Sequence, residues 1–212
     1  MSQAFAGTVD SIFIARGESS QDDPLFTLER WLREARAAIG FAANAMALAS
    51  VGSSGDPDVR VVLLQAIRHG ELVFFTNLDS PKGRQLLQSG KAALCFYWPE
   101  MGRQVRVRGR AALVEEPFAD EYFATRPRGS QIGAHASAQS TVIASRSALL
   151  DRVSAIDARY AGIVPRPSWW SGFCVKPAEI EFWEDGVDRL HDRLLFSRSE
   201  ADGAWSASRL SP

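Results

Sequence analysis

The densest group of charged and protonatable side chains lies near the C-terminal end, in the segment DRLHDRL at 188–194. On a strand, successive side chains alternate between two faces, which would bring Arg189, His191 and Arg193 onto one side. Three such groups in a row suit an anionic ligand that also carries a ring atom to orient. A solvated charged face has the same pattern, so the residues alone leave both interpretations open.

A second candidate anion site lies in the segment EYFATRPRGSQIG at 121–133. Pro127 interrupts one helix and can begin another, which would place Ser130 in the first turn of the second helix. Free N–H groups and the helix dipole favour an anion at that point. Tyr122, Arg126 and Ser130 would then form a phosphate cradle, although a plain helix–turn–helix with a surface arginine fits equally well.

Other basic residues are less specific. Arg60 begins an apolar run, Lys82 lies in the first turn of an expected helix, and Gln104 stands in the alternating arginine and valine run at 103–110. That alternation is typical of a strand with one polar and one apolar face. The sequence has no GxGxxG, GxxxxGK[ST], HExxH or GxSxG motif and only three histidines, which argues against dinucleotide-binding, P-loop, metal and Ser–His sites.

The composition is that of an ordinary globular protein. The 212 residues carry a net charge of −1, and 46% of them are hydrophobic. No global field would recruit nucleic acid or an acidic membrane, so any anion site must be a local cluster. No membrane span or export signal is recognisable, which predicts a cytoplasmic protein. Cys95 and Cys174 lie in apolar runs and are expected to be buried, reduced thiols.

The expected elements are a mobile arm at 1–23 and a single domain at 24–212. Asp22 or Asp23 can cap a first helix that begins at Pro24 and ends near Gly40. Ser80 and Pro81 indicate the start of another helix. Expected strands are 45–51, 59–67, 71–77, 93–98, 103–116, 172–184, 188–198 and 204–210, and expected helices are 82–90, two within 117–144, and 145–160. This order predicts an α+β fold, a β-barrel with peripheral helices.

Taken together, these segments resemble the pyridoxine/pyridoxamine 5'-phosphate oxidase family from about Asp23 to the C-terminus. The most specific pieces are RVVLLQ, VFFTNLDSPKG, RQVRVRG, YFATRPRGSQIGA, the pair Gln139-Ser140, IEFWEDG, and DRLHDR followed by RLSP. The resemblance implies an FMN-binding split β-barrel with flanking helices, assembled as a homodimer with FMN at the subunit interface.

The resemblance also implies the activity and the site. The protein would be an FMN-dependent oxidase that converts pyridoxamine or pyridoxine 5'-phosphate to pyridoxal 5'-phosphate, with O2 as acceptor and H2O2 as product. Arg189 and His191 would be catalytic. The implied FMN-binding residues are Arg60, Phe75, Thr76, Lys82, Gln104, Gln139, Ser140, Trp183 and Arg193. The implied substrate-binding residues are Gln65, Tyr122, Arg126, Ser130, Arg189 and His191. No metal is expected.

Several positions depart from the family pattern. Gln65 replaces a lysine that contacts the substrate phosphate, Pro81 replaces a basic residue before Lys82, and His135 stands where tryptophan is common. The arm reads SIFIARGESSQ, with Arg16 but without the usual tyrosine. These changes weaken the substrate side more than the FMN side. They leave two alternatives: an oxidase on the same scaffold that acts on another substrate, such as a dihydrophenazine in phenazine biosynthesis, and a non-catalytic binder of flavin or pyridoxal phosphate.

Overall fold

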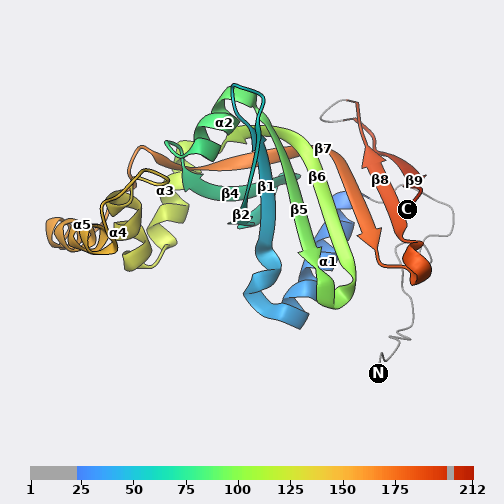
Figure 1. The fold of residues 1–212 in the computed structure, drawn as a ribbon, viewed down its shortest axis with the longest axis horizontal. Helices are drawn as coiled ribbons and strands as arrows, with labels where there is room; N and C mark the ends of the chain where they lie inside the picture. The colour runs from blue at the N-terminus through green and yellow to red at the C-terminus, as the bar shows by residue number, and fades with distance from the viewer. Residues whose placement is uncertain (1–22, 200–202) are drawn as a thin grey trace.

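The structure, a computed structural model, describes residues 23–199 and 203–212. The expected arm at 1–23 therefore lies, apart from Asp23, outside the described residues. Within the described part, nine strands form one curled antiparallel sheet in the order β2-β1-β5-β6-β7-β4-β3, and β8 and β9 extend it from β7 (Figure 1). The strands are β1 Ala45–Val51, β2 Pro57–Leu63, β3 Ala66–Arg68, β4 Glu71–Asn77, β5 Lys91–Trp98, β6 Arg103–Leu113, β7 Trp170–Glu184, β8 Asp192–Ser197 and β9 Ser206–Leu210.

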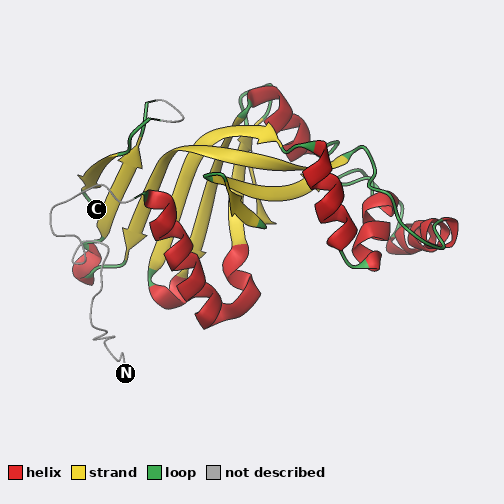
Figure 2. Cartoon of the chain, turned by 180° about the vertical axis from the view of Figure 1, so that it is seen from behind, coloured by secondary structure: helices red, strands yellow, loops and turns green. Residues whose placement is uncertain are grey.

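The helices lie around this sheet, which confirms the predicted barrel with peripheral helices. Helix α1 covers the concave back of the sheet, whereas α3, α4 and α5 project from the end opposite to β8 and β9 (Figure 2). The helices are α1 Pro24–Ile39, α2 Pro81–Ser89, α3 Glu116–Thr125, α4 Arg128–Ala136 and α5 Arg146–Arg159, with short 3-10 turns η1 Gly40–Asn44, η2 Pro99–Met101 and η3 Val187–Arg189. No helix of the described residues has the length and apolarity needed to cross a membrane.

Local chemistry explains where the helices begin. The Asp23 carboxylate accepts a hydrogen bond from the Leu25 amide at 2.9 Å, and Pro24 fits the first turn. The apolar face of α1 is buried in the core, where Trp31 meets Phe182 edge to face at 5.2 Å between ring centroids. Helix α2 begins in the predicted way, at Pro81.

The predicted bounds of two strands are wrong. The run 59–67 is divided into β2 and β3, because the Leu64 amide bonds to Asn44 O whereas the next amide, of Gln65, bonds to Val73 O, both at 2.8 Å. The chain thus leaves β1 and joins β4 at this corner. The run 188–198 is a strand only from Asp192. The residues before it form the turn η3, so Arg189 and His191 do not lie on a strand and the alternation argument fails for them.

Two smaller expectations also need correction. Cys95 and Cys174 are free thiols as predicted, but both are only partly buried. Burial raises the pKa of the Cys174 thiol to about 11. The spacing of Leu149, Leu150, Val153 and Ile156 predicts an apolar stripe on the helix at 145–160. Val153 and Ile156 do pack against the buried cluster around Phe123, but Leu150 is 52% exposed and no residue of α5 is fully buried.

Candidate active site

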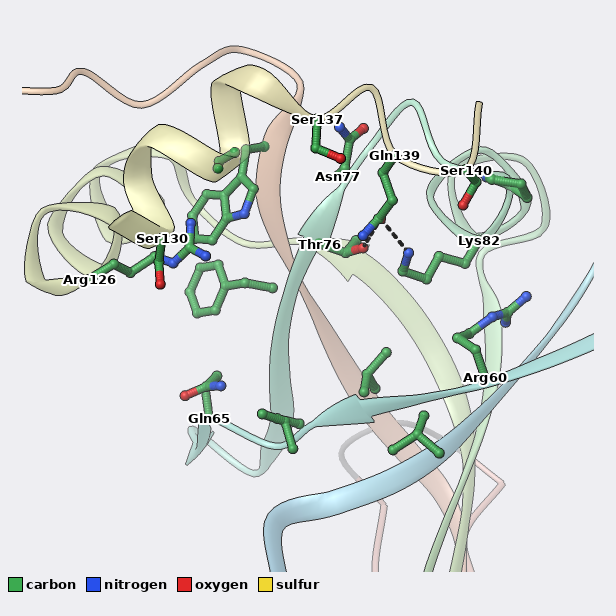
Figure 3. A pocket seen from close by; sticks show the side chains of 18 of the residues that line it. Arg60, Gln65, Thr76, Asn77, Lys82, Arg126, Ser130, Ser137, Gln139 and Ser140 are labelled. Carbon is green, nitrogen blue, oxygen red and sulfur yellow. Dashed lines mark hydrogen bonds between the residues drawn. The ribbon is translucent and has the colours of Figure 1, made fainter. Parts of the chain in front are cut away.

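Most of the predicted site residues line one cavity. It has a volume of about 830 Å³ and lies between β2, β4, α2 and α4, with the loop 137–140 over it (Figure 3). The predicted residues that line it are Arg60, Gln65, Phe75, Thr76, Lys82, Tyr122, Arg126, Ser130, Gln139 and Ser140. These residues come from five separate segments of the sequence, and the sheet and helices bring them together.

Lys82 forms the most deeply buried cation of the cavity. Ser80 caps α2, its hydroxyl accepting from the Gly83 amide, and this places Lys82 in the first helical turn. The Lys82 ammonium donates to Gln139 Oε1 at 2.6 Å and to Ser80 Oγ at 3.1 Å. Burial lowers the pKa of Lys82, nearby Arg60 lowers it further, and Asp58 opposes them. A buried cation with only neutral acceptors is ready to receive an anion.

Arg60 adds a second cation at the same end of the cavity. Its guanidinium donates to Leu48 O at 3.0 Å and to Ser50 Oγ at 2.6 Å, and it pairs with Asp58. The lining of the cavity holds the three cations Arg60, Lys82 and Arg126, against Asp58 as its single carboxylate. The cavity is therefore a local cationic cluster in a chain whose net charge is −1.

The other end of the cavity has a flat aromatic wall. The rings of Phe75, Tyr122 and Trp170 are nearly parallel, with centroid distances from Phe75 of 4.0 Å to Tyr122 and 5.1 Å to Trp170. The Arg126 guanidinium lies 4.7 Å from the Trp170 ring, and its buried Nη1 has no hydrogen-bond partner within residues 23–199 and 203–212. Burial raises the pKa of Tyr122, and Arg126 opposes this effect. An unpaired guanidinium nitrogen inside a cavity is the donor that an absent anion would satisfy.

Ser130 lies in the first turn of α4, as predicted, but its amide is not free. The Ser130 N–H donates to Pro127 O at 2.8 Å, so the expected contribution of this amide to an anion site is wrong. In Figure 3, the Ser130 hydroxyl lies beside Arg126, on the opposite side of the cavity from Arg60 and Lys82. The hydroxyl, and not the amide, is the group that Ser130 offers to a ligand.

Four polar or aromatic residues of the lining were missed from the sequence, namely Asp58, Asn77, Ser137 and Trp170. Asn77 and Trp170 are direct partners in the pairing of β4 with β7, so the sheet register places them together. The aromatic-rich loop PSWW was the signal for Trp170. Asn77 and Ser137 gave none, because their approach depends on tertiary packing.

The remaining predicted residues form a second group at the far end of β7. The sheet register sets Gln104 opposite Trp183, and Trp183 opposite Arg193, in a single row across β6, β7 and β8. Residues directly opposite each other share one face of a sheet. The His191 ring lies 4.6 Å from the Trp183 ring, and Arg189 belongs to the adjoining turn η3.

A buried carboxylate that the sequence did not reveal fixes this group. Glu181 accepts from Arg193 Nε at 2.9 Å and from Arg106 at 3.0 Å, and its exposure is 7%. Arg193 also donates to Ser211 O at 2.9 Å. Arg193 Nη2 also pairs with Glu181 Oε1 at 2.8 Å, so Arg193 has three contacts with chain atoms, which leave two of its five N–H groups for a ligand.

One copy of the chain does not bring the two groups together. Trp183 lies twelve residues after Ser171, the partner of Thr76, on the same strand. At about 3.3 Å per residue, this separates the groups by about 40 Å along β7. In Figure 1, β8 and the α3–α4 region accordingly lie at opposite ends of the molecule. The cationic cavity and the Trp183 row are therefore two separate groups in one copy of the chain.

The residues of the cavity fit a planar, phosphorylated cofactor. Two cations and several amide or hydroxyl groups lie at one end, and aromatic faces lie at the other. A curled antiparallel sheet with such a cavity defines a split-barrel protein that binds a phosphorylated ligand. The matches to family models specify this class further. Residues 32–160 match the pyridoxamine 5'-phosphate oxidase model, and residues 170–212 match the pyridoxine 5'-phosphate oxidase C-terminal dimerisation region. The chain belongs to the pyridoxamine 5'-phosphate oxidase family, which confirms the resemblance.

Relatives and solved structures agree with this assignment. A pyridoxine/pyridoxamine 5'-phosphate oxidase of Brucella anthropi is 50% identical over 92% of this chain and 96% of its own. One from Agrobacterium fabrum is 47% identical over 92% and 95%. The crystal structure of PhzG from Burkholderia lata, in complex with tetrahydrophenazine-1-carboxylic acid, superimposes with a TM-score of 0.87 at 32% identity, covering 97% of this chain and 100% of that one.

Proposed function

We propose that the protein is an FMN-dependent oxidase that converts pyridoxamine or pyridoxine 5'-phosphate to pyridoxal 5'-phosphate. The observation that carries the proposal is the cavity: Arg126, whose buried Nη1 has no partner among the described residues, lies at one end, and the cations Arg60 and Lys82 lie at the other. The relatives from Brucella anthropi and Agrobacterium fabrum, which are named pyridoxine/pyridoxamine 5'-phosphate oxidases, are 50% and 47% identical to this chain, whereas PhzG is 32% identical. This difference supports the proposed activity over the phenazine alternative.

The two ends of the cavity suit two phosphate groups. Lys82 and Arg60 would hold the FMN phosphate, with Thr76, Gln139 and Ser140 donating or accepting around it. At the other end, Arg126 would bind the substrate phosphate bidentately, as its planar guanidinium allows, and the hydroxyls of Tyr122 and Ser130 would complete the cradle. Gln65 would provide a neutral amide there. The Phe75 ring would lie against the cofactor.

The Trp183 row would come from a second copy. Gln104, Trp183 and Arg193 of that copy would close the cofactor site, and its Arg189 and His191 would orient the pyridine ring of the substrate. When bound, FMN supplies the acceptor for a hydride from the substrate carbon that bears the amine or alcohol, and O2 takes the electrons to give H2O2. The chain's own part is to bind, orient and exclude water.

A homodimer with shared sites has a direct test. If each site combines the cavity of one chain with the Trp183 row and the adjoining turn of the other, Lys82→Met damages one half-site and Arg189→Ala damages the other. At an FMN concentration that saturates the wild type but not Lys82→Met, each variant alone would be nearly inactive. When equal amounts of the two variants are dissociated and reassembled, half of the dimers contain one chain of each kind. In such a mixed dimer, one of the two sites carries both substitutions and the other carries neither. About a quarter of the wild-type activity should therefore return. An inactive mixture whose chains are shown to have exchanged would refute shared sites.

The first experiment is a visible spectrum of the purified protein, followed by anaerobic addition of pyridoxamine 5'-phosphate. Flavin bands that bleach, and peroxide that forms when O2 is admitted, support the proposal. Bands that persist refute the substrate and direct attention to dihydrophenazines. Bleaching without peroxide on admission of O2 refutes the oxidase, and a colourless protein that takes up no FMN refutes the cofactor. We also propose a cytoplasmic location, which the two free thiols support.

A further inference from the structure

The turn between β7 and β8 holds the His191 ring from one side. The Gly186 amide donates to His191 Nδ1 at 3.2 Å, and the Asp185 carboxylate lies 3.1 Å from the same nitrogen. The Trp183 ring packs against the imidazole at 4.6 Å between centroids. Both polar partners thus contact Nδ1, and Nε2 has no protein partner in the part of the chain that the structure describes.

The backbone of this turn is rigidly placed. The Asp185 amide donates to Gly102 O at 2.8 Å. A Cβ on Gly186 would lie 2.1 Å from Leu190 O, so only glycine allows the two sides of the turn to approach this closely. Asp188 and Arg189 have φ values of 56° and 63°, a conformation that costs energy in residues other than glycine. The position of the Gly186 N–H relative to His191 is therefore set by the fold.

A nitrogen that accepts a hydrogen bond from an amide carries no hydrogen of its own. In the neutral ring, Nδ1 cannot both accept from the Gly186 amide and donate to the Asp185 carboxylate. The amide is fixed by the backbone, whereas the Asp185 side chain is 64% exposed and satisfied by water, so acceptance from Gly186 leaves Nδ1 bare and places the hydrogen on Nε2. When His191 is protonated, both nitrogens carry hydrogen, and Nδ1–H has the Asp185 carboxylate as its acceptor. In both states, Nε2 carries a hydrogen.

We propose that Asp185 and Gly186 are positioning residues that keep His191 a permanent hydrogen-bond donor at Nε2. His191 then binds an acceptor atom of the substrate ring and does not remove a proton through Nε2. The identity of the bound ring rests on the proposed function, but the state of the imidazole does not.

The imidazole is observable without substrate. Nitrogen-15 NMR distinguishes the two neutral tautomers, and the sequence has only His69, His135 and His191, so the signal that His191→Gln removes identifies the ring. We expect a bare Nδ1 and a protonated Nε2 in the neutral form, both in the wild type and in Asp185→Asn, whose amide can donate to Nδ1 as Gly186 does. A neutral ring with its hydrogen on Nδ1 would overturn the proposal, even if pyridoxamine 5'-phosphate were not the substrate.

Turnover gives an independent test. The amide nitrogen of glutamine reaches about as far as Nε2, whereas that of asparagine stops nearer to Nδ1. His191→Asn should therefore have a KM about tenfold or more above that of His191→Gln, the loss of one hydrogen bond to a ligand, and His191→Gln should retain both limbs of the wild-type pH profile. A proton-accepting role would instead make His191→Gln lose about 10²- to 10⁴-fold in kcat, together with one limb of the pH profile.

Discussion

Replacing Lys82 by methionine should weaken FMN binding and, at the same time, leave the cofactor-free protein at least as stable. Lys82 is 9% exposed, and among the described residues its ammonium donates to the neutral acceptors Gln139 and Ser80. Its charge is therefore only partly compensated until a phosphate binds. Loss of a charge-assisted hydrogen bond of about 1.5–3 kcal/mol corresponds to a Kd for FMN that is about 10- to 150-fold higher.

The stability of the apoprotein should change in the other direction. Burial, followed by Arg60, lowers the pKa of Lys82 in the folded state below its ordinary value of 10.5. The unfolded chain then binds the proton more tightly, so this lysine costs stability at neutral pH, and the cost is relieved as the pH rises toward 10.5. Lys82→Met removes both the cost and this rise, and the long apolar chain of methionine fills the same space.

The assay combines an FMN titration with urea unfolding of the apoprotein at neutral and alkaline pH. Lys91→Met, the same change at an exposed lysine, is the matched control and should alter neither quantity. An FMN affinity changed by less than about threefold would refute the assignment of Lys82 to the phosphate. An apoprotein destabilised by more than about 1 kcal/mol would refute the account of an uncompensated buried charge.

Three further changes test other parts of the site. Gln65→Lys adds a cation at the Arg126 end and should lower the KM for pyridoxamine 5'-phosphate by about 5- to 30-fold, whereas an unchanged or higher KM would contradict the phosphate placement. Gly172→Ala places a Cβ 2.8 Å from the Phe75 ring and should cost about 1–3 kcal/mol in urea unfolding, which an unchanged midpoint would contradict. Glu181→Gln should raise the Kd for FMN several-fold, because a neutral amide holds the Arg193 guanidinium less tightly than a carboxylate does. An unchanged Kd in an FMN titration of the dimer would show that Arg193 does not need this partner.

The parts of the fold that depend on local chemistry could be predicted. Asp23 and Ser80 are caps followed directly by proline, and the helices begin there. The corner at Gln65 could not be predicted, because it arises from a change of hydrogen-bond partner between two distant strands. The turn before Asp192 could not be predicted for another reason. Its alternating charged residues have the pattern of a strand, and nothing in the sequence indicates the positive φ values of Asp188 and Arg189.

The site shows the same division. The sequence pattern alone predicted an anion site at Arg126 and indicated the charged segment around His191. The other site residues were predicted from the resemblance to the family. Neither could show that these two groups lie at opposite ends of one strand. Glu181 was overlooked for a related reason: a glutamate inside an alternating strand looks like a solvent-facing residue until its two arginine partners, from β6 and β8, are seen.

The bend of β7 links the cationic cavity and the Trp183 row. The register between β6 and β7 shifts at Gly109, leaving Ala178 as an extra residue on β7. A Cβ at Gly109 would lie 2.1 Å from Lys176 O, so glycine permits the close approach at this bulge, and Arg198 Nε secures it by donating to Pro177 O at 2.8 Å. A bulge bends its strand and increases its twist. The cavity lies before this bend and the Trp183 row lies after it. In the proposed dimer, the angle at the bulge would therefore set where each chain presents its Trp183 row to the cavity of the other, and residues that touch no ligand would control the geometry of the shared site.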